Sequence, residues 1–222
     1  MKSPASRLGN SVRFIIFFAL AIVTTWLRNM TFDQNKISGL FGLLFFSIAA
    51  LTLLFFIRQF NLEKRYFSDR LNSLSDVFNN AFGFVIVMFL AVGGLTLLIA
   101  WLQVDGKLPV FSQEATGFEV VDMGFWLNIL MSGILMPIVN QYLVSGFFFN
   151  YFFRVESHLN IVLGMLLSGL LFALLQFQPW FMPAFLQASF GWLFALSYLR
   201  TNNLTVPIFL NIFSAILFIV LG

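Results

Sequence analysis

The sequence predicts an all-α fold, a polytopic transmembrane helical bundle of about seven spans. Its 222 residues are 60% hydrophobic and only 9% charged, with 32 phenylalanines, whereas about a quarter of the residues in a soluble domain are charged. The mean hydropathy is +0.93. The apolar residues gather in runs of about 20, the length at which a helix crosses the hydrocarbon core of a bilayer. These features indicate a multi-pass protein of the cell membrane.

Seven apolar runs are long enough to be spans. They cover residues 12–28, 37–57, 80–102, 124–152, 159–178, 181–199 and 203–221. The first resembles a secretory signal, but WLRNM stands where the small residues of a cleavage site belong, so we expect an uncleaved helix. The fourth is long enough to tilt or to project beyond the bilayer. The sixth contains Pro183 and Gly191 and is expected to be irregular or buried among its neighbours.

The distribution of Lys and Arg predicts the orientation. Nine of these residues fall at the N-terminus, in the stretch 58–78 and at Arg154 and Arg200, against three on the other side. Because cytoplasmic loops are enriched in Lys and Arg, we expect a cytoplasmic N-terminus and an external C-terminus. The net charge of +3 is spread over short polar gaps between apolar runs, which favours membrane topology over nucleic-acid binding.

The chain is expected to have two parts. Residues 1–123 hold the first three helices, a cytoplasmic linker at 58–78 and an external loop at 103–123, and residues 124–222 hold the remaining helices. We interpret the linker as a plain connection. The alternative is a short amphipathic surface helix that rests Phe60, Leu62, Tyr66, Phe67, Leu71 and Leu74 on headgroups.

The external loop is acidic. Its candidate contacts for a partner are Asp105, Glu114, Glu119 and Asp122. A plain solvated connection is the commoner explanation for such a loop.

The residue types available limit the chemistry. The chain has no cysteine and one histidine, His158, so disulfides, thiolate nucleophiles and cysteine- or histidine-based metal sites are excluded. From residue 124 onward, tyrosines apart, the ionisable side chains lie in predicted turns; they are Arg154, Glu156, His158 and Arg200. The cations at the ends of the first spans, where long side chains snorkel, are Arg13, Arg28 and Arg58. We therefore expect no buried carboxylate or imidazole, no metal and no cofactor.

Three segments of the C-terminal part follow one another in a characteristic order. They are MPIVNQYLVSGFFFNYF from residue 136, SGLLFALLQ from residue 168 and FGWLFALSYLRTNNLTVPIFLNIFSA from residue 190. In this order they resemble the core of the CAAX-protease and bacteriocin-processing (CPBP, or Abi) family of intramembrane proteases, whose motifs are E-E-x-x-x-R, F-x-x-x-H and H-x-x-x-N. The resemblance covers about residues 124–221 and lies more in the framework than in the motifs.

The ionisable positions of these motifs are replaced in this chain. In chain order the degenerate positions are Asn140, Gln141, Ser145, Gln176, Asn211 and Ala215. The first two stand for the glutamates, the third for the arginine, the next two for the histidines and the last for the asparagine. Phe172 of the second motif is kept.

The resemblance implies that active members use the first glutamate and the second-motif histidine to activate a water, while the third motif holds the oxyanion. Asn140 and Gln176 cannot accept a proton at neutral pH, and Ala215 has no donor. Gln141 and Ser145 keep the four-residue spacing of the family's ion pair without its charges. Losing a general base costs about two to four powers of ten in rate. We therefore expect a non-catalytic relative and no enzyme.

Adjacent amides inside an apolar run call for a structural explanation, because unpaired polar groups are costly in lipid. We expect Asn140, Gln141, Gln176 and Asn211 to hydrogen-bond to one another and join the motif helices, at about 0.6 to 2 kcal/mol for each bond. A remnant site for a ligand or peptide is the alternative. The small packing residues are Ser132, Ser168, Ser189 and Ser214, and the packing or interfacial aromatics are Tyr142, Tyr151, Trp180 and Trp192.

The functional hypothesis is a membrane scaffold or regulator that binds and orients another membrane protein in the lipid bilayer. Non-catalytic relatives in this family are associated with membrane-anchored enzymes that cleave peptidoglycan glycan strands, so the resemblance implies a single-span cell-wall hydrolase as the partner. One alternative is an active CAAX or bacteriocin-processing protease with a divergent site. Another is a bacteriocin-immunity protein, whereas the lack of a repeat and of buried charge disfavours a transporter.

Overall fold

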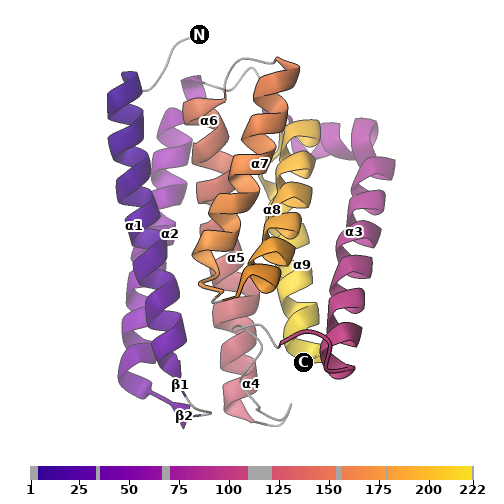
Figure 1. Cartoon of the computed structure of the whole chain (residues 1–222). Coiled ribbons are helices and arrows are strands. Elements are labelled where there is room, and N and C mark those ends of the chain that lie inside the picture. The colour runs from indigo at the N-terminus through magenta and orange to yellow at the C-terminus, as the bar shows by residue number, and fades with distance from the viewer. Residues whose placement is uncertain are drawn as a thin grey trace.

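The chain folds into a bundle of roughly parallel and antiparallel helices (Figure 1). The computed structural model describes residues 5–33, 36–66, 71–109, 122–153, 157–178 and 180–221. Six described helices are long and apolar enough to cross a membrane: α1 (Arg7–Thr31), α2 (Gly39–Glu63), α3 (Leu74–Val104), one long helix over Met123–Phe152, α7 (His158–Leu175) and α8 (Phe181–Thr201). The apolar helix α9 (Thr205–Leu221) has 17 residues. The predicted polytopic helical bundle is confirmed, and α1 begins at the opposite end from the one where α9 ends (Figure 1).

The first two helices form an antiparallel hairpin. Strand β1 (Phe32–Asp33) pairs with β2 (Lys36–Ile37) at the turn, and α2 then runs without a break through residues 58–63 into a short 3₁₀ turn, Lys64–Tyr66. Phe60 is buried and packs edge-on against Tyr142, at 5.5 Å between ring centroids. Residues 58–66 therefore belong to α2 and its 3₁₀ end, and α3 begins at Leu74. The bounds 58–78 expected for the linker are wrong, and no separate surface helix forms over residues 58–66. Phe67 lies outside the described residues.

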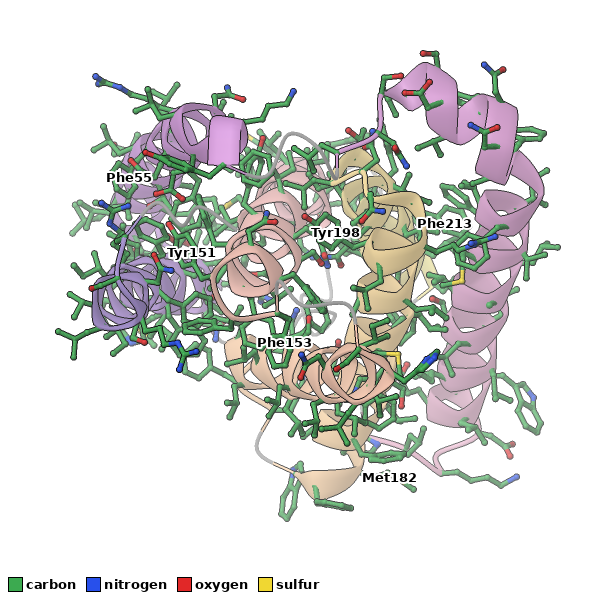
Figure 2. All side chains as sticks on the ribbon, turned by 90° about the horizontal axis from the view of Figure 1, so that it is seen from above. Phe55, Tyr151, Phe153, Met182, Tyr198 and Phe213 are labelled. Carbon is green, nitrogen blue, oxygen red and sulfur yellow. The ribbon has the colours of Figure 1, made fainter. Side chains whose placement is uncertain are left out.

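Helix α3 lies at the edge of the bundle. Ser73 and Asp76 form a capping box that starts the helix at Leu74, and its first turns lie across one end of the bundle before the rest runs beside α9 (Figure 1). Phe213 of α9 points toward α3 (Figure 2) and packs on Phe89, with the ring centroids 5.3 Å apart. Seen from above, the other faces of α3 carry exposed apolar side chains (Figure 2), as expected of a helix that faces lipid.

The long helix over Met123–Phe152 occupies the centre of the bundle and is not a regular α-helix. It consists of α4 (Met123–Asn128), a π-helical segment (Ile129–Leu135), α5 (Met136–Gln141), a second π-helical segment (Tyr142–Phe147) and α6 (Phe148–Phe152). The amide of Met136 donates to Met131 and that of Phe148 to Leu143, each five residues back. Such π segments are frequent at functional sites, and here they flank the short α5 that carries Asn140 and Gln141.

Helices α7 and α8 form a hairpin whose turn lies partway along the bundle (Figure 1). The two helices touch at Gly169 and Gly191. A Cβ atom added to Gly191 would lie 2.6 Å from the Cα of Gly169, closer than two carbon atoms approach. Gly191 is thus buried, as expected for the sixth span. Pro183 causes no irregularity, because it lies in the first turn of α8, where a missing N–H removes no helical hydrogen bond.

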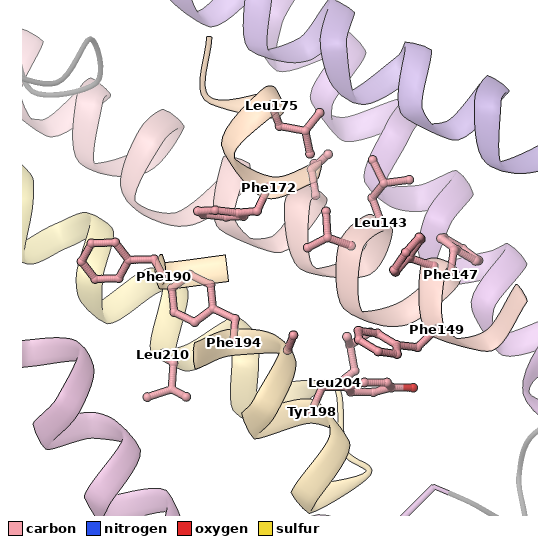
Figure 3. Close-up of a cluster of buried hydrophobic side chains, with 14 of the residues drawn as sticks. Leu143, Phe147, Phe149, Phe172, Leu175, Phe190, Phe194, Tyr198, Leu204 and Leu210 are labelled. Carbon is pink, nitrogen blue, oxygen red and sulfur yellow. The ribbon is translucent and has the colours of Figure 1, made fainter. Parts of the chain in front are cut away.

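An aromatic core holds these helices together (Figure 3). Phe147 contacts Phe17 of α1 with ring centroids 4.7 Å apart, and Phe172 of α7 contacts Phe194 of α8 edge-on at 5.4 Å. Each such pair contributes about 0.5–1.5 kcal/mol beyond the area it buries. The first pair fixes the second π segment of the central helix against α1, and the second pair fixes α7 against α8.

Replacing Gly169 by alanine should destabilise the α7–α8 hairpin by about 1–3 kcal/mol, the usual cost of overpacking. The new methyl would overlap the Trp192 indole and lie 2.6 Å from the backbone oxygen of Ala188. Gly94→Ala on α3 is the matched control, since its Cβ would meet nothing within 4 Å. In thermal unfolding in detergent, Gly169→Ala should have a lower melting temperature than the unmodified protein, whereas Gly94→Ala should have the same one. Equal melting temperatures for the two variants would refute the proposed contact.

Candidate functional site

A small polar cavity lies where α1, the long central helix, α7 and α9 meet. Its volume is about 10 Å³, and it is lined by Thr25, Arg28, Ser132, Met136, Pro137, Asn140, Gln176, Asn211 and Ala215. The lining includes four of the six degenerate motif positions, which are far apart in the sequence. The backbone framework therefore brings these four positions to one point, as the family resemblance implies.

The amides around this cavity do not form the mutual network that we expected. Asn140 is 2% exposed, and its Oδ1 atom has no hydrogen-bond partner among the described residues. Asn211 donates through Nδ2 to the backbone oxygen of Pro137 at 3.5 Å. For Asn140 and Asn211 the expected mutual hydrogen bond is wrong, because Asn211 donates to the backbone of Pro137 and Asn140 Oδ1 has no partner among the described residues.

Gln141 points away from the cavity. Successive residues on a helix differ by about 100° in direction, so Asn140 and its neighbour cannot line the same space. The Ser145 hydroxyl donates to Gln141 Oε1 at 2.6 Å, and both side chains are fully buried. The two positions at which the resemblance implies an ion pair are thus joined by a neutral hydrogen bond within one helix. Gln141 Nε2 has no partner among the described residues.

A second polar cavity adjoins the first. It is also about 10 Å³ in volume and shares Gln176, Asn211 and Ala215 with it. Gln187 of α8 completes its polar wall and is buried. Gln187 was not among the predicted site residues, although a glutamine inside the apolar run 181–199 could have indicated a buried polar site.

Arg28 is the charged residue of the first cavity, and its predicted position was wrong. We expected it to snorkel at the end of the first span, but it is 3% exposed and lines the cavity. Helix α1 continues to Thr31, so Arg28 does not end the helix. Thr24, Thr25, Arg28 and Thr31 are all buried, and their helical spacing places them on one inward face. The spacing of these polar residues in the sequence could have predicted that Arg28 is buried.

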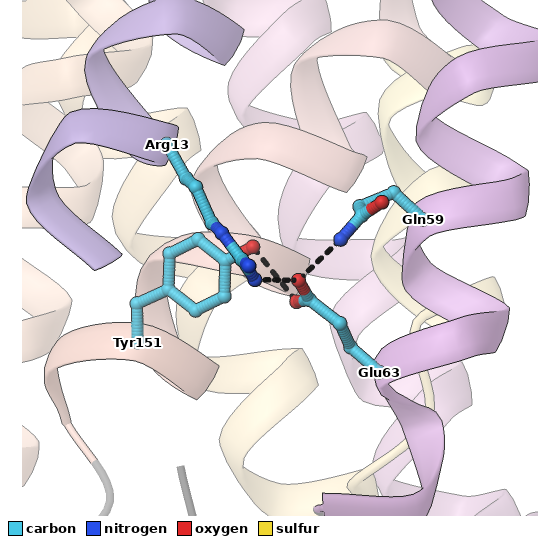
Figure 4. A network of polar contacts seen from close by, with 4 residues as sticks. All are labelled: Arg13, Gln59, Glu63 and Tyr151. Atoms are coloured by element: carbon cyan, nitrogen blue, oxygen red, sulfur yellow. Dashed lines mark hydrogen bonds and ion pairs between the residues drawn. The ribbon is translucent and has the colours of Figure 1, made fainter. Parts of the chain in front are cut away.

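A buried carboxylate also contradicts the expectation that the bundle has none. Glu63, at the end of α2, is 3% exposed and accepts hydrogen bonds from Arg13 Nη1 at 2.9 Å, Tyr151 Oη at 2.7 Å and Gln59 Nε2 at 2.5 Å (Figure 4). This Glu63 cluster joins α1, α2 and α6. Tyr151 follows Asn140 by eleven residues, about 16 Å along a helix, so the cluster lies apart from the polar cavities.

The serines of the motif helices serve packing. Ser168 of α7 donates to the backbone oxygen of Val144 at 2.9 Å, and Ser132 donates to Asn128 at 2.6 Å. Ser214 of α9 shares a hydrogen bond with Thr96 of α3 at 3.2 Å. Two of these bonds join neighbouring helices, in agreement with the interpretation as packing residues.

Two of the candidate acidic contacts are described. Asp105 is exposed and pairs with Lys107 at 2.6 Å. Asp122 is exposed just before α4. Glu114 and Glu119 lie outside the described residues. Within the described ranges, no group of three or more histidine and acidic side chains is placed to hold a metal ion.

An apolar groove of about 740 Å³ lies between α1 and the α7–α8 hairpin. Its walls include Phe18 and Ile22 of α1, Leu174 of α7, and Ala184 and Phe185 of α8. Leu174 and Phe185 are exposed on the apolar exterior of the bundle. In a membrane the groove therefore opens toward lipid.

The fold and the site define a polytopic helical membrane protein with an amide-lined cavity at the intramembrane-protease motif positions. Residues 122–217 match the sequence model of the type II CAAX prenyl endopeptidase Rce1-like family. The match covers the central helix, α7, α8 and most of α9, and it supports the family resemblance of this part of the chain. Searches of curated proteins and of solved structures found no match.

Replacing Glu63 by alanine should destabilise the protein by about 2 kcal/mol, because Tyr151 loses its buried acceptor while Arg13, 39% exposed, regains water. Tyr151→Phe should cost about 1 kcal/mol. Asp105→Ala, which removes an exposed ion pair, should change stability by less than about 0.5 kcal/mol. Thermal unfolding in detergent ranks the three variants, and an equal effect of Glu63→Ala and Asp105→Ala would refute the role of the Glu63 cluster.

Proposed function

We propose that this protein is a non-catalytic relative of the CAAX-type intramembrane proteases that binds another membrane protein and holds it in position. One observation carries the proposal: the cavity at the motif positions is lined by Asn140, Gln176 and Asn211, which neither gain nor lose a proton near neutral pH. Peptide hydrolysis requires a group that takes a proton from the attacking water. A cavity of this composition supports binding and does not support hydrolysis.

The alternative of an active protease with a divergent site finds no base among the described residues that line the two cavities. Apart from amides and hydroxyls, the polar side chain of the linings is Arg28, and a guanidinium stays protonated at all accessible pH values. Glu63 is a base by type, but it accepts three hydrogen bonds in a separate cluster. Neither residue favours the protease alternative.

The apolar groove supports a partner that lies in the membrane. A helix or side chain from such a partner would cover the exposed aromatic wall formed by Phe181 and Phe185. The family resemblance implies a single-span cell-wall hydrolase that cleaves glycan strands, and we propose this class of partner. Asp105 and Asp122, both exposed, are proposed as contacts for the external part of the partner.

Purified protein should not cleave prenylated CAAX peptides or leader peptides above the rate in buffer, and Asn140→Ala and Gln176→Ala should behave as the unmodified protein does. We expect this because no described residue of the cavity lining can take a proton from the attacking water. Cleavage followed by mass spectrometry measures this, with an active member of the family as the positive control. Turnover by the unmodified protein that either substitution abolishes would establish the protease alternative instead.

Affinity purification in mild detergent should recover a single-span cell-wall hydrolase, identified by mass spectrometry. Ala184→Trp would fill the groove and should reduce the recovered hydrolase at least about tenfold, equivalent to about 1.4 kcal/mol. Leu97→Trp, on the exposed face of α3, is the control and should leave recovery unchanged.

Two further outcomes would change the proposal. Equal recovery with both tryptophan variants would remove the groove from the proposal. Loss of bacteriocin resistance on deletion, with cell-wall glycan length unchanged, would favour an immunity protein over the scaffold.

A further inference from the structure

We infer that the last turns of α2 form a binding site for the headgroup of an anionic phospholipid. Three exposed side chains make up this site, which we call the α2 basic row: Arg58, Asn61 and Lys64. They are spaced three residues apart, so they follow one another along the surface of the helix. All three side chains donate hydrogen bonds, and two of them are cationic. The inference is independent of the proposed function.

The α2 basic row lies at the depth of the lipid headgroups. Exposed apolar surface begins at the start of α2, where Leu40 is 67% exposed. A rise of about 1.5 Å per residue places Arg58 about 28 Å from Gly39, the first residue of the helix. The hydrocarbon core of a bilayer is about 30 Å thick, with the polar headgroups outside it. Arg58 therefore lies close to the boundary of the core, and Lys64 lies about 9 Å further out.

An exposed apolar strip continues from the row along α2. Leu54 and Leu62 lie four residues before and after Arg58, on the same face of the helix, and they are 66% and 58% exposed. Leu51, which is 64% exposed, extends the strip by another turn. A surface with an apolar strip and a cationic end matches the two parts of a phospholipid, its acyl chains and its phosphate. A free phosphate ion would use the cationic end alone.

Acidic side chains do not neutralise the α2 basic row. The ion pairs between described residues involve neither Arg58 nor Lys64. Glu63 adjoins Lys64 in the sequence, but its carboxylate is 3% exposed and accepts three hydrogen bonds within the Glu63 cluster. The positive charge of the row therefore faces an anionic group from outside the chain.

Arg58 carries most of the inference. A lysine at the C-terminal end of a helix also stabilises the partial negative charge there, so Lys64 has a second role, whereas Arg58 lies before the last turn of α2. A guanidinium binds two oxygens of one phosphate through parallel N–H bonds. A zwitterionic headgroup brings a cation of its own, which the row repels, so the charge of the row favours an anionic lipid such as phosphatidylglycerol.

The test measures lipid binding by the purified full chain in detergent. Phosphatidylglycerol and phosphatidylcholine are supplied together in equal amounts, and native mass spectrometry counts the molecules of each that the protein retains. Thermal unfolding is then measured with each lipid alone and with inorganic phosphate. We expect preferential retention of phosphatidylglycerol and a higher melting temperature in its presence, because a ligand that binds the folded state stabilises it. Equal retention of the two lipids would overturn the inference, and so would equal stabilisation by inorganic phosphate, which would identify a site for a soluble anion.

Two variants locate the site. Arg58→Gln removes the charge from an exposed position and should reduce the retention of phosphatidylglycerol about fivefold, the effect of one basic residue near an anionic membrane surface. Arg200→Gln is the matched control. Arg200 is exposed in the last turn of α8, but Leu204, four residues later, is buried, so no apolar strip continues on both sides of it. The control should retain phosphatidylglycerol as the unmodified protein does, and an equal loss in both variants would refute the assignment to α2.

Discussion

The structure depends on one constraint: a polar side chain inside the bilayer cannot fall back on water and must find its partner within the bundle. The described polar contacts follow this rule at several depths. Glu63 accepts hydrogen bonds from three side chains, Ser168 of α7 donates to the backbone of Val144 in the central helix, and Thr96 of α3 shares a hydrogen bond with Ser214 of α9. These contacts specify which helices are neighbours, and the aromatic core packs the same helices together.

The positions that align with the family motifs come together in this chain around a cavity lined by amides. Close packing at Gly169 and Gly191 sets the α7–α8 hairpin, and the two π segments set the rotation of the short α5 between them. Both features belong to the backbone and to small residues, and neither requires an ionisable side chain. A framework of this kind can match the family in sequence while amides such as Asn140 and Gln176 stand where the resemblance implies an acid and an imidazole.

The helices were predictable because an apolar run of about 20 residues crosses a membrane as an α-helix. Their ends were not, since polar residues extend several of them: α3 begins at Leu74 rather than near 80, where Ser73 and Asp76 form its cap. The convergence of Asn140, Gln176 and Asn211 followed from the family resemblance. The burial of Glu63 did not, because its partner Tyr151 is 88 residues away in the chain, and no local pattern reports such a contact.

The polar lining of the cavity has an energetic cost that bears on its use. Replacing a buried ionic or polar group by a well-packed apolar one of similar volume is often neutral or stabilising, so packing alone does not require Arg28 or the unpartnered amide of Asn140. Among the described residues of the lining, Arg28 and the three amides do not accept a proton at neutral pH, which agrees with the proposed role in binding.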